Sequence, residues 1–102
     1  MRDDVFPGGL LLSPVRALAW DAPASVATLD VAALGDLFDL EPKPEFLLLG
    51  TGAGLLQPPR AFVRALEALD IGVEAMDSRA AARAWGVLRA EERWVVAALL
   101  PL

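Results

Sequence analysis

The sequence predicts a single α/β domain, in which an N-terminal antiparallel hairpin is followed by parallel βαβαβ units and the helices pack on a mixed sheet. Within residues 46–100, short apolar runs bounded by turn residues alternate with segments of helical periodicity. Strands that alternate with helices pair in parallel through right-handed crossovers. Two further apolar segments precede any helical pattern, and a chain of 102 residues forms one domain.

The N-terminal part of the chain predicts the hairpin. Residues 1–8 form a charged lead that we expect to be loosely ordered, and residues 10–12 are a short apolar strand. Pro14 interrupts this strand because proline cannot donate to a sheet ladder. Residues 15–20 then alternate, so that one face carries three larger side chains: Arg16, Leu18 and Trp20.

The middle of the chain predicts a helix, a buried strand and a second helix. Asp30 is expected to cap a short helix over residues 31–38, where apolar residues recur at helical spacing. Residues 46–49 are a continuous apolar run, which is typical of a central strand covered on both faces. Pro59 favours the start of the next helix, over residues 60–69.

The C-terminal part repeats the strand–helix–strand pattern. Residues 71–76 alternate like a strand, and Asp77 or Ser78 is expected to cap the helix that follows. Residues 91–93 turn the chain, and residues 94–100 are a last apolar strand. The predicted order of elements is therefore β-β-α-β-α-β-α-β.

The composition weighs against an enzyme. The chain has no His and no Cys, so a Ser-His-Asp or Cys-His nucleophile system is impossible within it, and thiolate metal sites are excluded. We expect no catalytic residues, no cofactor and no metal. Arg outnumbers Lys and Ala is frequent, a composition that fits a bacterial source.

Charge and hydropathy indicate which partners to expect. The net charge of −5 and the lack of a basic cluster make nucleic acid a poor partner. No uncharged apolar stretch is long enough to span a bilayer, and the N-terminus lacks the apolar region of a signal peptide, so we expect a cytoplasmic protein without a transmembrane segment. Hydrophobic residues make up 56% of the chain, which suggests self-association or a protein partner.

One candidate site lies where two predicted parallel strands end. The glycine loop of residues 50–54 could hold an anion on its backbone amides, although such a loop more often serves a tight turn. Asp77 and Ser78 follow the next strand, so the loop and this pair could share one crevice; both residues also suit a plain helix cap. Arg83 is expected to form a buried salt bridge with Asp77 or Glu91. The ligand-binding candidates are Gly50, Thr51, Gly52, Gly54, Asp77, Ser78 and Arg83.

A second candidate site is an apolar surface. Leu55 and Leu56 fall in a predicted loop, and Trp85 and Trp94 occur further along the chain. Aromatic and apolar residues of this kind form either plain core or an interface. These four residues are the candidate interface.

Several motifs together resemble a known family. They are Gly50-Thr51-Gly52 after an apolar strand, Met76-Asp77-Ser78, Ala80-Ala81, Arg83 and the run of residues 91–93. In this order they resemble the family catalogued as domain of unknown function 498, and the resemblance covers residues 8–102. The family includes a mitochondrial complex I assembly factor and many bacterial members without assigned activity.

Two hypotheses for function remain, the first implied by the resemblance and the second by the candidate ligand site. The first is a non-enzymatic, partner-binding protein that acts like an assembly factor. The alternative is a small-molecule or anion-binding protein, or a degraded enzyme, that uses a crevice at the strand ends. Family members commonly carry Ala-Cys-Arg-Thr-Tyr-Asn after the Met-Asp-Thr motif, whereas residues 81–86 here read Ala-Ala-Arg-Ala-Trp-Gly. The chain has thus lost most of the polar groups of that segment.

Overall fold

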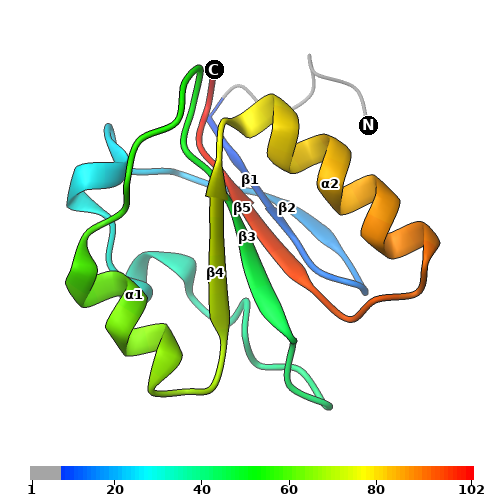
Figure 1. The fold of residues 1–102 in the computed structure, drawn as a ribbon. Coiled ribbons are helices and arrows are strands. Elements are labelled where there is room, and N and C mark those ends of the chain that lie inside the picture. Colours follow the sequence, from blue (N-terminus) through cyan, green and yellow to red (C-terminus); the bar gives the residue numbers. More distant parts are fainter. Residues whose placement is uncertain (1–7) are drawn as a thin grey trace.

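Five strands form one mixed sheet in the computed structural model, which describes residues 8–102 (Figure 1). The order across the sheet is β2-β1-β5-β3-β4, where the strands are β1 (Leu10–Leu12), β2 (Ala17–Ala19), β3 (Phe46–Gly50), β4 (Gly72–Met76) and β5 (Val96–Leu99). β3 pairs in parallel with both β4 and β5. β1 pairs antiparallel with β2 and with β5. The predicted fold class, including the N-terminal hairpin, is confirmed.

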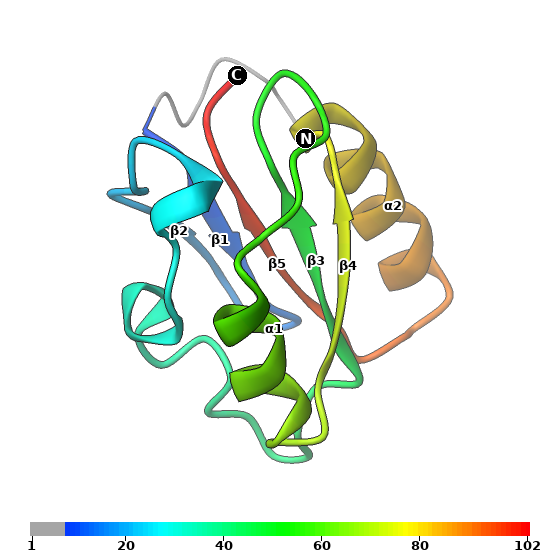
Figure 2. The same cartoon turned by 60° about the vertical axis from the view of Figure 1, so that its left-hand side comes forward.

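The two α-helices cover opposite faces of the sheet (Figure 2). Side chains of successive strand residues point to opposite faces. On one face, Leu47 and Leu49 of β3 pack in a cluster with Phe62 and Leu66 of α1 (Arg60–Glu67). On the other face, Leu48 packs in a cluster with residues of α2 (Ser78–Ala90). The connections that follow β3 and β4 therefore leave the sheet in opposite directions.

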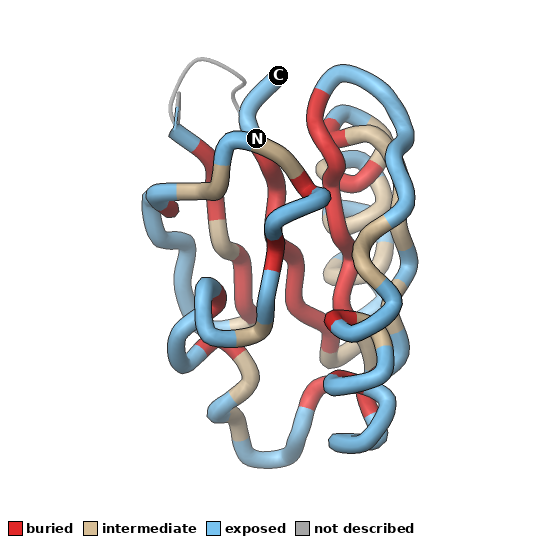
Figure 3. Tube along the Cα trace, turned by 90° about the vertical axis from the view of Figure 1, so that its left-hand side faces the viewer, coloured by how far each residue is buried: buried red, intermediate tan, exposed pale blue. Residues whose placement is uncertain are grey.

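The core is centred on β3 and β5, which have neighbours on both sides and a helix on each face (Figure 3). Every residue of β5 is buried, as are four of the five in β3. This pattern explains why both strands are continuous apolar runs rather than alternating ones.

The predicted helix over residues 31–38 is wrong in type and length. The chain forms two short 3-10 helices, η1 (Val26–Thr28), which was not predicted, and η2 (Val31–Leu34). The Asp30 side chain caps η2 by accepting from the Ala33 amide at 3.1 Å, as expected. η2 ends at Gly35, whose φ of 57° lies in the left-handed region that glycine adopts readily.

α1 is also shorter than predicted, ending at Glu67 instead of residue 69. As a consequence Leu69, the last residue of the predicted helix, lies in the turn after α1 and is 50% exposed. The positive φ of Asp70, 65°, helps the chain to reverse into β4.

The Glu45 carboxylate connects the starts of β3 and β5. It accepts from Nη2 of Arg93 at 2.7 Å and from the Trp94 amide at 3.2 Å. The Glu45 amide donates to the Trp94 carbonyl at 2.8 Å. The hydrogen bond from Arg93 and then the bond from the Trp94 amide hold the pKa of Glu45 below its ordinary value.

Two further expectations concern the N-terminal lead and the absence of a transmembrane segment. The lead, residues 1–8, lies outside the described residues except for Gly8. Within residues 8–102, no helix has the length and apolar character required to cross a bilayer.

Candidate functional site

The predicted ligand site lies at the carboxyl ends of β3, β4 and β5. These strands are parallel, so their carboxyl ends meet at one edge of the sheet. The connections after β3 and β4 leave to opposite faces, the position where open α/β sheets commonly bind ligands. The structure brings the glycine loop and the Asp77-Ser78 pair together here, with the Gly52 nitrogen 2.9 Å from Oγ of Ser78.

The polar groups at this junction bond to one another. The Gly52 amide donates to Oγ of Ser78, and this hydroxyl donates to the Leu100 carbonyl at 2.7 Å. The Ser78 amide in turn donates to the Gly52 carbonyl at 2.8 Å. Ser78 is 5% exposed. The hydroxyl and the Gly52 amide therefore connect α2, the glycine loop and the end of β5, and neither points to an open cavity.

Thr51 stabilises the loop that follows β3. Its hydroxyl donates to the Gly54 carbonyl at 2.6 Å and accepts from the Leu56 amide at 3.1 Å. The residue is 4% exposed, so these bonds are shielded from water. Among the four ligand candidates of the loop, Thr51 thus stabilises the loop itself. Gly54, by contrast, is exposed and has open space where a side chain would begin.

Asp77 caps α2. Its carboxylate accepts from the Ala80 amide at 2.9 Å, the geometry expected of an N-cap. Arg83, by contrast, is exposed, and the buried salt bridge predicted for it is wrong. Among residues 8–102 the ion pairs are Arg16–Asp36 and Glu45–Arg93. The side of α2 that packs on the sheet carries Ala81, which leaves Arg83 on the solvent side.

The four interface candidates lie in three different places. Leu55 and Leu56 follow the glycine loop at the carboxyl edge and are 57% and 55% exposed. Trp94 precedes β5 at the opposite end of the parallel strands, their amino end, where its indole nitrogen donates to the Pro42 carbonyl at 2.6 Å. Trp85 lies on α2, half-buried against the cluster on that face. Only the two leucines form a contiguous exposed apolar feature.

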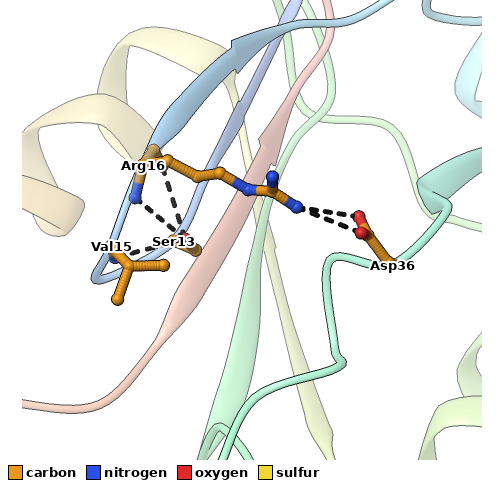
Figure 4. Close-up of polar contacts among 4 residues, drawn as sticks. All are labelled: Ser13, Val15, Arg16 and Asp36. Carbon is orange, nitrogen blue, oxygen red and sulfur yellow. Dashed lines mark hydrogen bonds and ion pairs between the residues drawn. The ribbon is translucent and has the colours of Figure 1, made fainter.

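The structure contains a hollow that the sequence reasoning missed. It lies between the β1–β2 hairpin and the segment after η2, and its volume is about 170 Å³. Arg16 reaches across it to Asp36, with 3.1 Å between Nη2 and Oδ2 (Figure 4). The alternation that placed Arg16, Leu18 and Trp20 on one face was the available signal. The lining residues are Leu11, Ser13, Val15, Arg16, Leu18, Asp36, Leu37, Asp39 and Leu40.

No clustering of metal-binding side chains is found in the described part of the chain: nowhere in residues 8–102 do three or more His, Cys, Asp or Glu residues gather so as to hold an ion. Asp77 at the junction instead caps α2, and Asp36 at the hollow pairs with Arg16.

The fold and the junction define a class of protein: a small α/β domain with one five-stranded mixed sheet, a helix on each face and a polar junction closed by its own hydrogen bonds. Comparison with known proteins assigns the family. The chain belongs to the family described as "Protein of unknown function (DUF498/DUF598)", whose model matches residues 1–100. The resemblance noted from the sequence motifs is thereby confirmed.

Three relatives illustrate the extent of the similarity. An uncharacterised protein of Rhodobacter capsulatus is 39% identical over 98 residues, which cover 96% of this chain and 73% of that protein. NADH dehydrogenase [ubiquinone] 1 alpha subcomplex assembly factor 3 of Danio rerio is 32% identical over 94 residues, which cover 92% of this chain and 53% of the fish protein. A crystal structure of a Bordetella parapertussis protein superposes with a TM-score of 0.78 at 38% identity, covering 92% of this chain and 79% of that one. The chain is thus a distant homologue of the assembly factor and spans about half of its length.

Proposed function

We propose that this protein binds a protein partner and catalyses no reaction, as an assembly factor does. The homology to an assembly factor of complex I supports this proposal. The residue inventory supports it as well, because a chain without His and Cys lacks the side chains that most often act as general base and nucleophile. The cytoplasmic location expected from the sequence is part of the same proposal.

The observation that carries the proposal is the pair Leu55–Leu56. More than half of each side chain is exposed, at 57% and 55%, although large aliphatic residues are usually buried. The hydroxyl of Thr51 holds the backbone on both sides of Leu55, through the Gly54 carbonyl and the Leu56 amide. A loop that is already ordered loses little conformational entropy on binding. The two leucines therefore form a preorganised apolar contact for a partner.

The alternative, an anion or small-molecule site at the strand ends, has weaker support. A backbone amide that binds an anion must have its N–H directed at the ligand. The Gly52 amide instead donates to Ser78, and the Ser78 hydroxyl donates to Leu100. Arg83, the one cation among the candidates, is exposed on α2. Trp85 and Trp94 remain interface candidates, but each is half-buried and they lie apart from the leucines.

Affinity purification from the native host tests the proposal. A tagged protein carrying Leu55→Asp and Leu56→Asp is compared with the wild type, and the captured proteins are identified by mass spectrometry. The matched control carries Leu69→Asp and Val87→Asp, since these side chains are 50% and 60% exposed in other regions. Both double variants are expected to keep their unfolding free energy within about 0.5 kcal/mol per substitution, because the sites are on the surface.

We expect a partner that the wild type and the control capture in equal yield and that the Leu55→Asp, Leu56→Asp variant loses. Capture of the same proteins by all three would contradict the role of the leucines. A wild-type protein that captures nothing at native expression level would contradict the partner-binding function itself.

A further inference from the structure

The strand β2 forms one outer edge of the sheet. It pairs with β1 on one side, and on its other side no strand lies among residues 8–102. All three of its residues, Ala17–Ala19, are exposed. An edge strand of this kind presents unpaired backbone donors and acceptors to which another chain can pair.

The direction of the backbone groups follows from the hairpin register. The Arg16 carbonyl accepts from the Ser13 amide at 2.9 Å, and the Trp20 amide donates to the Gly9 carbonyl at 3.1 Å; Gly9 and Ser13 flank β1. Alternate residues of an antiparallel strand direct their N–H and C=O groups to opposite sides. Leu18 therefore bonds towards β1, whereas the amides and carbonyls of Ala17 and Ala19 point outward.

The two edges of the sheet differ in how they are protected. Proteins usually block an exposed edge with a charged side chain, a proline or a bulge. β4, the other edge, carries the exposed charge of Glu74 at its centre. β2 has the sequence Ala-Leu-Ala and carries no charge between residues 17 and 19. β2 spans only three residues, against five in β4, but no charged side chain blocks it, so it is the edge more open to strand addition.

The hollow lies beside this edge, on the face to which Leu18 points. Leu11, Leu18, Leu37 and Leu40 provide its apolar walls, and Leu18 is 41% exposed. A cavity of about 150 Å³ accommodates a benzene-sized group, and the hollow measures about 170 Å³. A strand added to β2 would direct every second side chain to this face, so the hollow can take one apolar side chain of that strand.

The charge around the hollow indicates what the added strand carries. Asp36 and Asp39 line the hollow. Arg16 pairs with Asp36, which leaves the negative charge of Asp39 uncompensated. Residues 8–50 as a whole hold six acidic and two basic side chains, a net charge of −4. Two copies of so acidic a surface would repel each other, whereas a basic segment would be attracted.

We propose that β2 is a docking edge, where an extended segment of a partner protein adds as a sixth strand, placing an apolar side chain in the hollow and a Lys or Arg beside Asp39. This inference rests on the proposed partner-binding function but uses a surface separate from Leu55–Leu56. Main-chain hydrogen bonds to Ala17 and Ala19 give the affinity, and the hollow gives the specificity, as in other complexes formed by strand addition.

A defined peptide tests the inference on the full chain. The ¹⁵N-labelled protein is titrated with a synthetic ten-residue peptide of alternating Val and Lys, and a peptide of alternating Val and Glu is the matched probe. We expect the Lys peptide to shift the amide signals of β2 and of the residues that line the hollow, and to protect the Ala19 amide from hydrogen exchange. The Glu peptide is expected to bind at least about tenfold more weakly, because the surface is acidic.

Two variants separate strand pairing from simple charge attraction. Ala17→Pro removes an outward amide without changing the charge, and edge strands tolerate proline. The Ala17→Pro variant is expected to bind the Lys peptide about tenfold more weakly, whereas the control Ala17→Ser keeps the amide and binds with the same affinity. Should the proline variant fold poorly, Leu18→Gln replaces an apolar wall of the hollow without changing the charge and is expected to weaken binding of the same peptide.

Several results would overturn the inference. These are the absence of binding, equal binding of the Glu peptide, shifts centred on Leu55 and Leu56, or an Ala19 amide that is already protected in the free protein, through a second copy or residues 1–7. Loss of peptide binding together with intact capture of a partner through Leu55–Leu56 would reject this inference alone and leave the proposed function standing.

Discussion

Among the glycines of residues 8–102, Gly50 occupies the most crowded position. A Cβ at this position would lie 2.7 Å from Oγ of Ser78, 2.9 Å from its Cα and 2.8 Å from Cδ2 of Leu99. These distances are shorter than real Cβ contacts, and one of the neighbours is a backbone atom that cannot rotate away. The first glycine of the loop therefore permits the close approach of α2 to the sheet, a packing role.

Gly50→Ala is predicted to destabilise the protein strongly. The expected loss is about 1–3 kcal/mol or more of unfolding free energy, because the added methyl group must displace packed atoms. Gly86→Ala, the matched control, lies in the middle of α2 with nothing within 4 Å of the added atom. It is expected to stabilise the protein by about 0.5–1 kcal/mol, since alanine loses less entropy in a helix. Urea denaturation of both variants measures the contrast.

A stable Gly50→Ala protein would mean that α2 can move away from β3 at little cost. In that case the junction would be open enough to reconsider as a ligand site, since a ligand requires the same space. Crystal or NMR coordinates of the variant would then locate the displacement at Ser78 or at Leu99.

Residue roles were predictable where they depend on neighbours in sequence. Asp30 was expected to cap one helix and Asp77 or Ser78 another, and both aspartates accept from an amide three residues later. The role of Ser78 was not accessible, because its hydroxyl bonds to Gly52 and Leu100, which lie 26 and 22 residues away. A capping pattern is visible in a short window of sequence, whereas a tertiary hydrogen bond is not.

The regular elements followed from local pattern with one exception, the segment over residues 31–38. Leu34 and Leu37 are buried, as a helical stripe requires. The same spacing of three also fits a 3-10 helix, in which side chains three residues apart eclipse. Gly35 ends η2 by adopting a positive φ. Periodicity thus identified the buried face of this segment correctly but not its helix type.

Glu45 makes the link between the starts of β3 and β5 dependent on pH. Its pKa is lowered in the folded protein, so its ionised form contributes stability at neutral pH, and this contribution is lost as the pH falls through the folded-state pKa. Glu45→Gln removes the charge. The difference in unfolding free energy between wild type and variant is predicted to stay constant from pH 7 until the pH nears the ordinary pKa of a Glu carboxyl, and to shrink on further acidification. Urea denaturation at each pH measures it.

Glu41→Gln provides the control for this prediction, because Glu41 is an exposed residue of the preceding connection. Its difference from wild type is expected to stay small at every pH. A Glu45→Gln difference that is constant with pH, or that grows on acidification, would contradict the assignment. Added salt should reduce the effect, since the Arg93 and Glu45 side chains are 42% and 44% exposed.

At the scale of the molecule, the sequence predicted the kind of sheet but not its strand order. Parallel pairing followed from the alternation of strands and helices, and the hairpin from the paired apolar segments. That β1 would pair with β5, the last strand, could not be inferred, because any strand with a free edge offers the same backbone groups. The four interface candidates lie at opposite ends of the parallel strands and on α2, because Leu55 and Leu56 follow β3, Trp94 precedes β5 and Trp85 belongs to the helix.

The sheet order predicts a gradient of backbone protection. Amides of β3 and β5 are expected to exchange with solvent most slowly, because both strands are central and buried on both faces. Outward amides of β2 and those of residues 53–55, which are exposed, are expected to exchange fastest. Hydrogen exchange followed by NMR checks the ranking, and equal protection of β2 and β5 would contradict the described sheet.

The central position of β5 has a consequence for how the chain folds during synthesis. The β1–β2 hairpin and the β3–α1–β4 unit share no strand pairing, since β5 separates β1 from β3 in the sheet. A ribosome releases β5 after every other element. Until then the nascent chain carries two half-sheets whose facing edges, on β1 and β3, are both unpaired. The domain therefore closes in one late step, when residues 96–99 insert between them, and before that step the unpaired edges of its apolar strands are exposed to pairing with other chains.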